Sequence, residues 1–181
     1  FYDSEQNKKL FLSKKNITII AEIANVHEGN IEKLLQLVKE SKKSSAHAVK
    51  FQIFSAEELA TSNHKNFELY KKLQFTNTEW QKIGRITKKN GLKIFADVFG
   101  LKSAKIAAKI KVDGYKIHSS DISNKKLIEF LRKQKKTILV SSAGSKLIEI
   151  EKIVSIFQES NQHIILLHGF QGYPTKIEEL N

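Results

Sequence analysis

Four polar side chains that could do chemistry lie inside stretches that otherwise read as buried strands: Glu22, Lys50, Gln52 and Lys116. The stretches are 18–23 (TIIAEI), 48–54 (AVKFQIF) and 112–117 (VDGYKI). Parallel strands covered on both faces are almost continuously apolar, so a charge there is costly unless something pairs with it. Polar groups near the C-terminal ends of several strands are typical of the mouth of an enzymatic barrel. The pattern predicts a site for a small anionic molecule.

Spacing along these strands predicts which side chains share a face. Residues two positions apart point the same way, so Lys50 lies beside Gln52, and Lys116 beside His118. If these faces point inward with that of Glu22, the mouth holds one carboxylate and two ammonium groups. Further polar groups follow the fourth and fifth strands: Ser119, Asp121, Ser141 and Ser142. Lysines with hydroxyls can bind phosphate or carboxylate, and a nearby glutamate can act as a general base.

A simpler interpretation of the same residues stays open. Glu22 could only neutralise Lys50 or Lys116, as an ion pair inside the barrel. The histidines at 27, 118 and 168 are interpreted as turn or strand-end residues with hydrogen-bond partners.

The elements that must position these groups alternate along the chain. Apolar β-rich runs and segments of helical periodicity follow one another from Thr18 onward, which is typical of repeated βα units. The predicted strands are 18–23, 47–54, 92–98, 112–118, 136–142 and 163–168. The predicted helices are 31–44, 78–90, 103–110, 124–133 and 147–159.

Two architectures fit this alternation, a doubly wound open sheet and a (β/α)8 barrel. The first βα turn, residues 24–29 (ANVHEG), has a single glycine and lacks the glycine pattern of a dinucleotide site. We therefore predict an α/β fold of the (β/α)8 TIM-barrel type, with about six of the eight βα units in this chain. Residues 1–16 are predicted to form an N-terminal extension and residues 17–181 a partial barrel domain.

Composition narrows the class of protein. The 181 residues, 40% of them hydrophobic, are enough for one domain with a sizeable core. Cysteine is absent, which excludes disulfides and thiolate metal sites. The net charge is +12, but only two of the 31 basic residues are arginine and the lysines are scattered, so we predict no nucleic-acid partner. No apolar run is long enough to cross a membrane and no signal peptide is visible, so we expect no membrane partner and a cytoplasmic location.

Five segments, in order and spacing, resemble the sialic acid synthase (N-acetylneuraminate synthase) family: AEIANVHEGN, AVKFQIFSAEEL, GYKIHSSDISN, ILVSSAG and LLHGFQGYPT. The resemblance runs from about residue 17 to the end. It implies a C–C bond-forming transferase that condenses phosphoenolpyruvate with an N-acetylmannosamine-like 2-acetamido sugar, giving a nonulosonic acid and phosphate. It also implies a divalent metal, Mn²⁺ or Mg²⁺, and a homodimer for the full-length protein.

The resemblance carries roles to particular positions. It implies that Glu22 is the catalytic acid or base, and that Asp121 is catalytic where the family has a glutamate. It implies that the phosphate and carboxylate of phosphoenolpyruvate are bound by Lys50, Lys116, Ser119 and Ser141, and the sugar by Gln52 and Tyr173.

Two departures from the family pattern fall among the residues that we assign to substrate binding. Asp97 stands where a phosphate-facing threonine is expected, and its carboxylate is expected to repel phosphate unless it points away or meets a metal. Gln171 replaces an asparagine before the Tyr-Pro pair. The acceptor sugar could therefore differ from that of the family.

Family members continue beyond this sequence. We expect strands seven and eight and a small C-terminal antifreeze-like domain to be absent here, so that the metal ligands are not in this chain and this fragment alone is inactive. The alternative is a non-catalytic or truncated sugar-phosphate-binding relative of the same fold. A third possibility is a 3-deoxy-manno-octulosonate 8-phosphate synthase, but YKI-x-S and HGFQGYPT fit the sialic acid type better.

Overall fold

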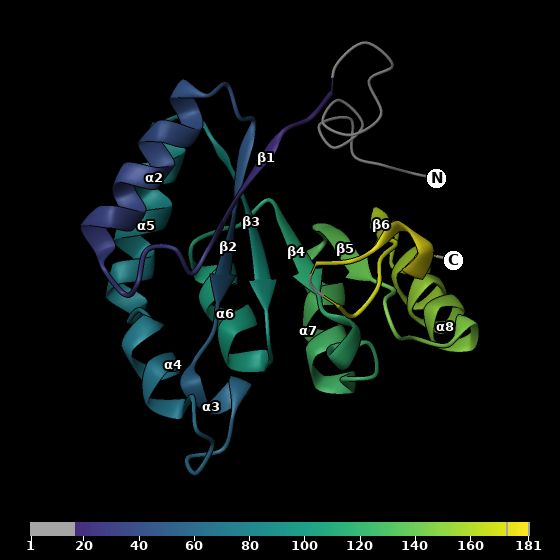
Figure 1. Ribbon diagram of the computed structural model, residues 1–181. Helices are drawn as coiled ribbons and strands as arrows, with labels where there is room; N and C mark the ends of the chain where they lie inside the picture. The colour runs from purple at the N-terminus through teal and green to yellow at the C-terminus, as the bar shows by residue number, and fades with distance from the viewer. Residues whose placement is uncertain (1–16, 173, 181) are drawn as a thin grey trace.

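A computed structural model describes residues 17–172 and 174–180 of the chain. Within them, six strands form one parallel sheet and helices follow the strands (Figure 1). The strands are β1 (Ile20–Ala24), β2 (Ala48–Ile53), β3 (Lys93–Val98), β4 (Gly114–Ile117), β5 (Thr137–Ser141) and β6 (Ile164–Leu167). Strands β2 to β6 each fall within a predicted strand, whereas β1 begins two residues later and ends one residue later than predicted. The predicted extension, residues 1–16, lies outside the described residues.

The order of the strands decides between the two predicted architectures. The sheet runs β1-β2-β3-β4-β5-β6 without reversal. A doubly wound sheet reverses its order at a switch point, whereas consecutive strands of a barrel are neighbours throughout. The prediction of six consecutive units of a (β/α)8 barrel is confirmed.

The helices are α2 (Ile31–Lys43), α3 (Ala56–Leu59), α4 (Phe67–Leu73), α5 (Asn77–Lys89), α6 (Leu101–Lys109), α7 (Lys125–Gln134) and α8 (Leu147–Gln158), with 3-10 turns η1 (Ser119–Asp121) and η2 (Ile177–Glu179). In Figure 1, α3 and α4 lie beyond the C-terminal end of β2, and the other helices lie along one face of the sheet. The sequence did not predict α3 and α4, because helices of 4 and 7 residues are too short to show a periodic pattern. Helix α6 begins two residues before its predicted start, because the Glu58 carboxylate accepts hydrogen bonds from the backbone N–H groups of Lys102 and Ser103.

The main core lies between the sheet and the helices. Its largest fully buried side chains include Trp80, Tyr115 and Phe51. In the part of the chain that the structure describes, no helix has the length and apolar composition to cross a membrane.

A second, smaller cluster lies on the inner face, away from the helices. We call Ala48, Phe95 and Leu139 the inner apolar layer; all three are buried. Gly114 makes room for it, since a Cβ at this position would lie 2.3 Å from the Phe95 ring. Because strand side chains alternate, the inner positions two residues further along these strands are Lys50, Asp97 and Ser141. The inner face is therefore apolar at one level and polar at the next.

Candidate active site

The register of the first four strands brings the predicted polar residues to one level of the inner face. Glu22 pairs with Lys50 between β1 and β2, and Asp97 pairs with Lys116 between β3 and β4. We call Glu22, Lys50, Asp97, Lys116 and His118 the ion-pair cluster. It lies toward the C-terminal ends of the strands, where barrel enzymes keep their active sites.

Lys50 is the most fully engaged cation of the cluster. Its Nζ donates to both carboxylate oxygens of Asp97, at 2.8 Å each, and forms an ion pair with Glu22. An ammonium has three hydrogens, so these contacts occupy all of them. The predicted alternative, an ion pair between Glu22 and a lysine, is thus present, but the Glu22 side chain is still 46% exposed and open to a ligand.

Lys116 is less engaged. Its Nζ lies 3.2 Å from Asp97 Oδ2 and its side chain is 16% exposed. With Asp97 as its hydrogen-bond partner among the described residues, two ammonium hydrogens remain for a ligand. Lys116 is therefore better able than Lys50 to bind an anionic group directly.

Asp97 neither points away from the site nor requires a metal to be accommodated. Its side chain is 1% exposed and contacts Lys50 and Lys116. Burial alone would raise the pKa of Asp97, but contacts with His118, Lys50 and Lys116 outweigh it and hold that pKa below its usual value. A buried carboxylate with two ammonium partners is charged and holds both lysines in place.

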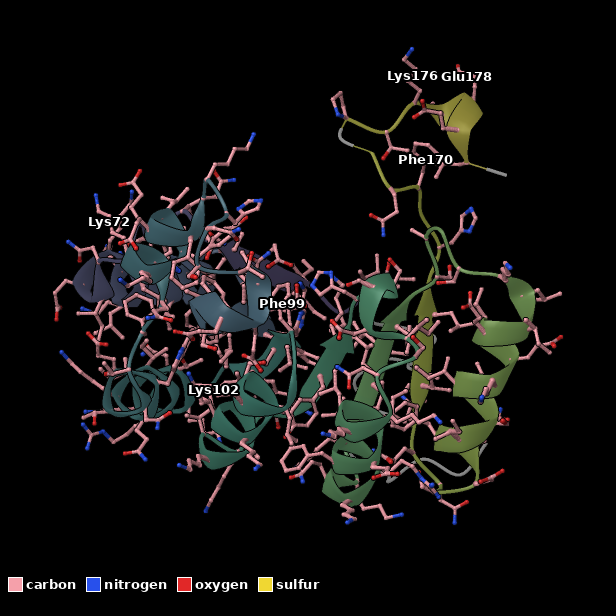
Figure 2. The ribbon with its side chains drawn as sticks, turned by 90° about the horizontal axis from the view of Figure 1, so that it is seen from below. Lys72, Phe99, Lys102, Phe170, Lys176 and Glu178 are labelled. Atoms are coloured by element: carbon pink, nitrogen blue, oxygen red, sulfur yellow. The ribbon has the colours of Figure 1, made fainter. Side chains whose placement is uncertain are left out.

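His118, which the sequence suggested was a strand-end residue, belongs to this cluster. Its Nε2 lies 3.6 Å from Asp97 Oδ2. Its ring stacks on Phe99 with centroids 4.6 Å apart and planes at 22°. Figure 2 labels Phe99 in the loop after β3. The two-residue spacing predicted that His118 shares a face with Lys116, and the structure places both beside Asp97 on the inner face.

The other predicted residues lie near the same strand ends. Gln52 accepts a hydrogen bond from Asn25 Nδ2 at 2.8 Å. Ser141 ends β5 and is partly buried. Asp121 accepts a hydrogen bond from Asn124 Nδ2 at 2.9 Å, at the start of α7, so its carboxylate is engaged in a local turn. No pattern in the sequence predicted the contact between Asn25 and Gln52.

The segment after β6 carries the last two predicted residues. Gln171 Nε2 donates to the hydroxyl of Ser119, which links this segment to the end of β4. Beyond Gln171, Figure 2 shows Lys176 and Glu178 on a part of the chain that extends away from the helices. Tyr173 lies outside the described residues.

The described residues of the candidate site do not form a metal site by themselves. Among residues 17–172 and 174–180, no three His, Asp or Glu side chains are grouped so that they could hold a metal ion. The carboxylates of the cluster are already neutralised by lysines. These residues alone would therefore not hold the divalent metal that the family resemblance implies.

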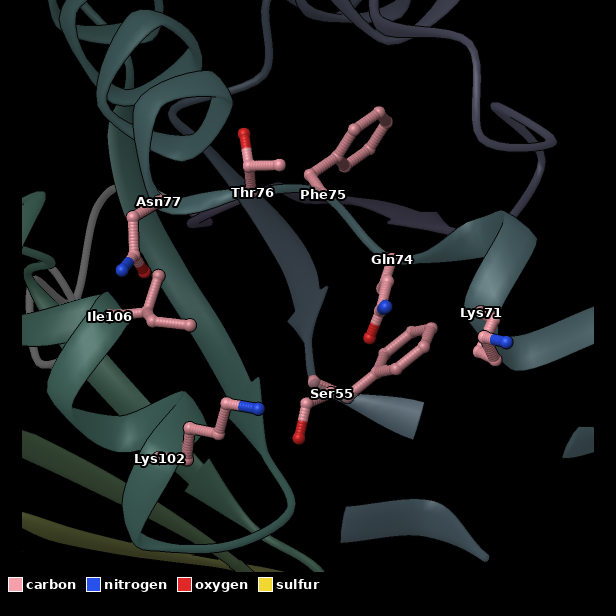
Figure 3. A pocket seen from close by; sticks show the side chains of 9 residues that line it. Ser55, Lys71, Gln74, Phe75, Thr76, Asn77, Lys102 and Ile106 are labelled. Carbon is pink, nitrogen blue, oxygen red and sulfur yellow. The ribbon is translucent and has the colours of Figure 1, made fainter. Parts of the chain in front are cut away.

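A separate pocket lies between the connection from α4 to α5 and helix α6 (Figure 3). Its volume is about 400 Å³, and its lining includes Ser55, Gln74, Thr76 and Lys102. None of its lining residues belongs to the ion-pair cluster, so we do not count it as part of the candidate site.

Comparisons with known proteins identify the family of this chain. A model of the NeuB family matches residues 37–181. An uncharacterized protein of Methanocaldococcus jannaschii is 33% identical over 90% of this chain and 49% of its own length. A pseudaminic acid synthase of Campylobacter jejuni is 28% identical over 94% of this chain and 54% of its own length. The chain thus spans about half the length of the curated relatives that it matches.

Comparison with solved structures also finds a similar protein. The crystal structure of a sialic acid synthetase from Leptospira borgpetersenii superposes with a TM-score of 0.84 at 30% identity. The match covers 91% of this chain and 58% of that one.

Proposed function

This chain belongs to the NeuB family, and on that premise we propose that it is part of a synthase that condenses phosphoenolpyruvate with a 2-acetamido sugar of the N-acetylmannosamine type. The products are a nonulosonic acid and inorganic phosphate. The activity is proposed for the protein from which this portion of the barrel comes, as a homodimer in the cytoplasm.

The observation that carries the proposal is the arrangement of Lys116 and Glu22 in the ion-pair cluster. Lys116 is anchored by Asp97 at 3.2 Å and keeps two hydrogens for an anion. Glu22 is anchored by Lys50 and remains 46% exposed, so its carboxylate can meet a bound ligand. A fixed cation beside an accessible carboxylate suits an anionic substrate that also needs proton transfer.

The proposed reaction needs groups that bind an anion and groups that transfer a proton. The methylene carbon of phosphoenolpyruvate forms a bond to the aldehyde carbon of the sugar, whose oxygen takes up a proton. Water adds to the former enol carbon, and the carbon–oxygen bond to phosphate breaks. Lys116 would bind the anionic groups of phosphoenolpyruvate, while Glu22 would transfer a proton near the reacting carbons.

The remaining predicted residues have supporting roles in this proposal. Ser119 and Ser141 would donate hydroxyl hydrogen bonds to phosphoenolpyruvate. Gln52, held by Asn25, would contact the acceptor sugar, and Gln171 would position Ser119. Tyr173 and Asp121 keep the roles that the family resemblance implies, as acceptor contact and second acid.

The test is phosphate release from phosphoenolpyruvate with N-acetylmannosamine and Mn²⁺, using the product of the complete reading frame. Glu22→Gln should lower kcat by about 100-fold or more, as for loss of a general acid or base. Lys116→Ala should raise KM for phosphoenolpyruvate by about 10-fold or more, because a hydrogen bond to a charged group is lost.

The control is Lys82→Ala, which removes an exposed lysine paired with Glu32 and should leave both constants unchanged. Failure to release phosphate with any 2-acetamido sugar would overturn the proposal. If phosphoenolpyruvate still binds in that case, the second candidate gains support: a sugar-phosphate-binding relative without catalysis. The observation that favours this second candidate is the full neutralisation of Lys50 by Asp97 and Glu22.

A further inference from the structure

The pairing of β1 with β2 shifts by one residue at the C-terminal end of β1, as in a β-bulge. Glu22 pairs with Lys50 of β2. The next residue of β1 to be paired is Ala24, which lies opposite Phe51. Ile23 is therefore the extra residue, and its side chain is buried in the main core. Bulges re-aim the side chains that follow them and are common beside active sites.

The bulge decides which residue of β1 lies beside Gln52. Without the extra residue, Ala24 would lie opposite Gln52 and would offer it no hydrogen-bonding side chain. With the shift of one residue, Asn25 takes this place, and its Nδ2 donates to Gln52 Oε1 at 2.8 Å. The contact between the two amides is thus a product of the bulge.

The same turn holds two locally unfavourable features. Ala24 has a φ of +45°, in the left-handed region, which costs a residue with a Cβ about 1–2 kcal/mol. Asn25 Oδ1 is buried and has no hydrogen-bond partner among the described residues. Such costs persist where the surrounding structure fixes a geometry, and they gather at functional sites.

The bulge also contacts the carboxylate proposed to transfer a proton. The backbone N–H of Ala24 donates to Glu22 Oε1 at 3.3 Å. The other oxygen of this carboxylate forms the ion pair with Lys50. One turn therefore contacts both Glu22 and Gln52.

The bond from Asn25 gives the Gln52 amide a defined direction. Oε1 is the acceptor in this bond, so Nε2 points away from Asn25. Gln52 is partly buried, and its Nε2 has no partner in the part of the chain that the structure describes. An amide NH2 group only donates, so the group that it can bind is a hydrogen-bond acceptor.

We propose that Asn25 is a positioning residue that holds the Gln52 amide with its NH2 group toward the acceptor sugar, where it donates to a sugar oxygen. This inference rests on the proposed function, which gives Gln52 a contact with the sugar but no orientation. Asn25 acts through Gln52 and does not itself need to touch the sugar. Its loss should therefore affect the use of the sugar and not that of phosphoenolpyruvate.

Steady-state kinetics of the full-length protein with phosphoenolpyruvate, N-acetylmannosamine and Mn²⁺ test this role. Asn25→Leu keeps the approximate volume and removes the bond to Gln52. It should raise KM for N-acetylmannosamine by about 5-fold, as for loss of a neutral hydrogen bond, and leave KM for phosphoenolpyruvate unchanged. The melting temperature should not fall, because the buried carbonyl oxygen without a partner is removed together with the bond.

Gln52→Glu tests the direction of the amide. The new carboxylate can still accept a hydrogen bond from Asn25 but has no hydrogen to donate to the sugar, so KM for N-acetylmannosamine should rise by about 10-fold. In a Gln52→Ala background, Asn25→Leu should have no further effect, because residues that act through one contact are not additive. The control is Gln36→Leu, which removes an exposed amide bonded to Glu40 and should behave as the wild type.

The outcomes separate the inference from the proposed function. In a protein that releases phosphate, additive effects of Asn25→Leu and Gln52→Ala, or an unchanged KM for the sugar in Gln52→Glu, would overturn the inference alone. A fall in melting temperature with equal rises in both KM values would make Asn25 a structural residue and overturn it as well. A full-length protein that releases no phosphate with any 2-acetamido sugar would overturn the proposed function, and this inference with it.

Discussion

The inner apolar layer and the ion-pair cluster lie on the same face of the sheet, two residues apart along the same strands. Ala48 is followed two residues later by Lys50, and Phe95 by Asp97. The first layer consists of buried hydrocarbon, and Gly114, which has no Cβ, leaves space for the Phe95 ring. In the second, Lys50, Asp97 and Lys116 are charged side chains of low exposure, and each has a partner of opposite charge. Low exposure therefore has different energetic origins in the two layers: transfer of hydrocarbon from water in the first and pairing of opposite charges in the second.

Removing one partner from the charged layer should have the largest effect on stability. Asp97→Ala leaves Lys50 and Lys116 without their shared counter-ion in a region of low exposure. We expect it to lower the free energy of unfolding by about 3–5 kcal/mol, as is typical when a buried pair is broken. Urea unfolding of the variant and the wild type measures this difference. A loss below about 1 kcal/mol would contradict the view that pairing holds this layer together.

Shortening a side chain in the apolar layer should lower the free energy of unfolding slightly less than Asp97→Ala does. It should leave the affinity for phosphoenolpyruvate unchanged. Leu139→Ala removes buried hydrocarbon, and we expect a loss of about 2–4 kcal/mol in the free energy of unfolding. Phosphoenolpyruvate affinity should stay within about 2-fold of the wild type, because dispersion contacts below the cluster carry no charge. A large change in affinity would show that the two layers are not independent.

Acid should weaken the charged layer selectively. Because the pKa of Asp97 is lowered in the folded protein, its charge contributes stability above the unfolded value of about 4, and that contribution is lost as pH falls through the folded pKa. The gap in unfolding free energy between the wild type and Asp97→Asn should therefore shrink on acidification. Urea midpoints from pH 7 to pH 2 measure it, and a constant gap would contradict the expectation.

A surface ion pair should show the smallest effect. Lys82 and Glu32 lie 3.0 Å apart, but their side chains are 44% and 74% exposed. Lys82→Ala should change the free energy of unfolding by less than about 1 kcal/mol, and less still at high salt. A loss as large as that of Asp97→Ala would mean that exposure does not distinguish the two kinds of pair.

Most of the fold, and the face of the sheet on which the site lies, could be predicted from the sequence. The alternation of apolar runs predicted six strands, and the two-residue spacing predicted that Lys50 and Gln52 share a face. It could not predict the contacts of Asp97, because they depend on how β2, β3 and β4 are aligned across the sheet. The same holds for His118, whose partners Asp97 and Phe99 lie on another strand and in a loop. Glu58 is a third case, since its carboxylate acts on a helix 44 residues away.

The pairing of opposite charges within the ion-pair cluster has a consequence for the rate at which an anion arrives and leaves. Paired charges exert little attraction at a distance, whereas the +12 net charge of the chain is carried by lysines spread over its surface. We therefore expect a higher ionic strength to lower the association rate of an anionic ligand and to change its dissociation rate little, because salt screens mainly exposed charges. The lysines that attract the ligand and those that retain it would then be different residues.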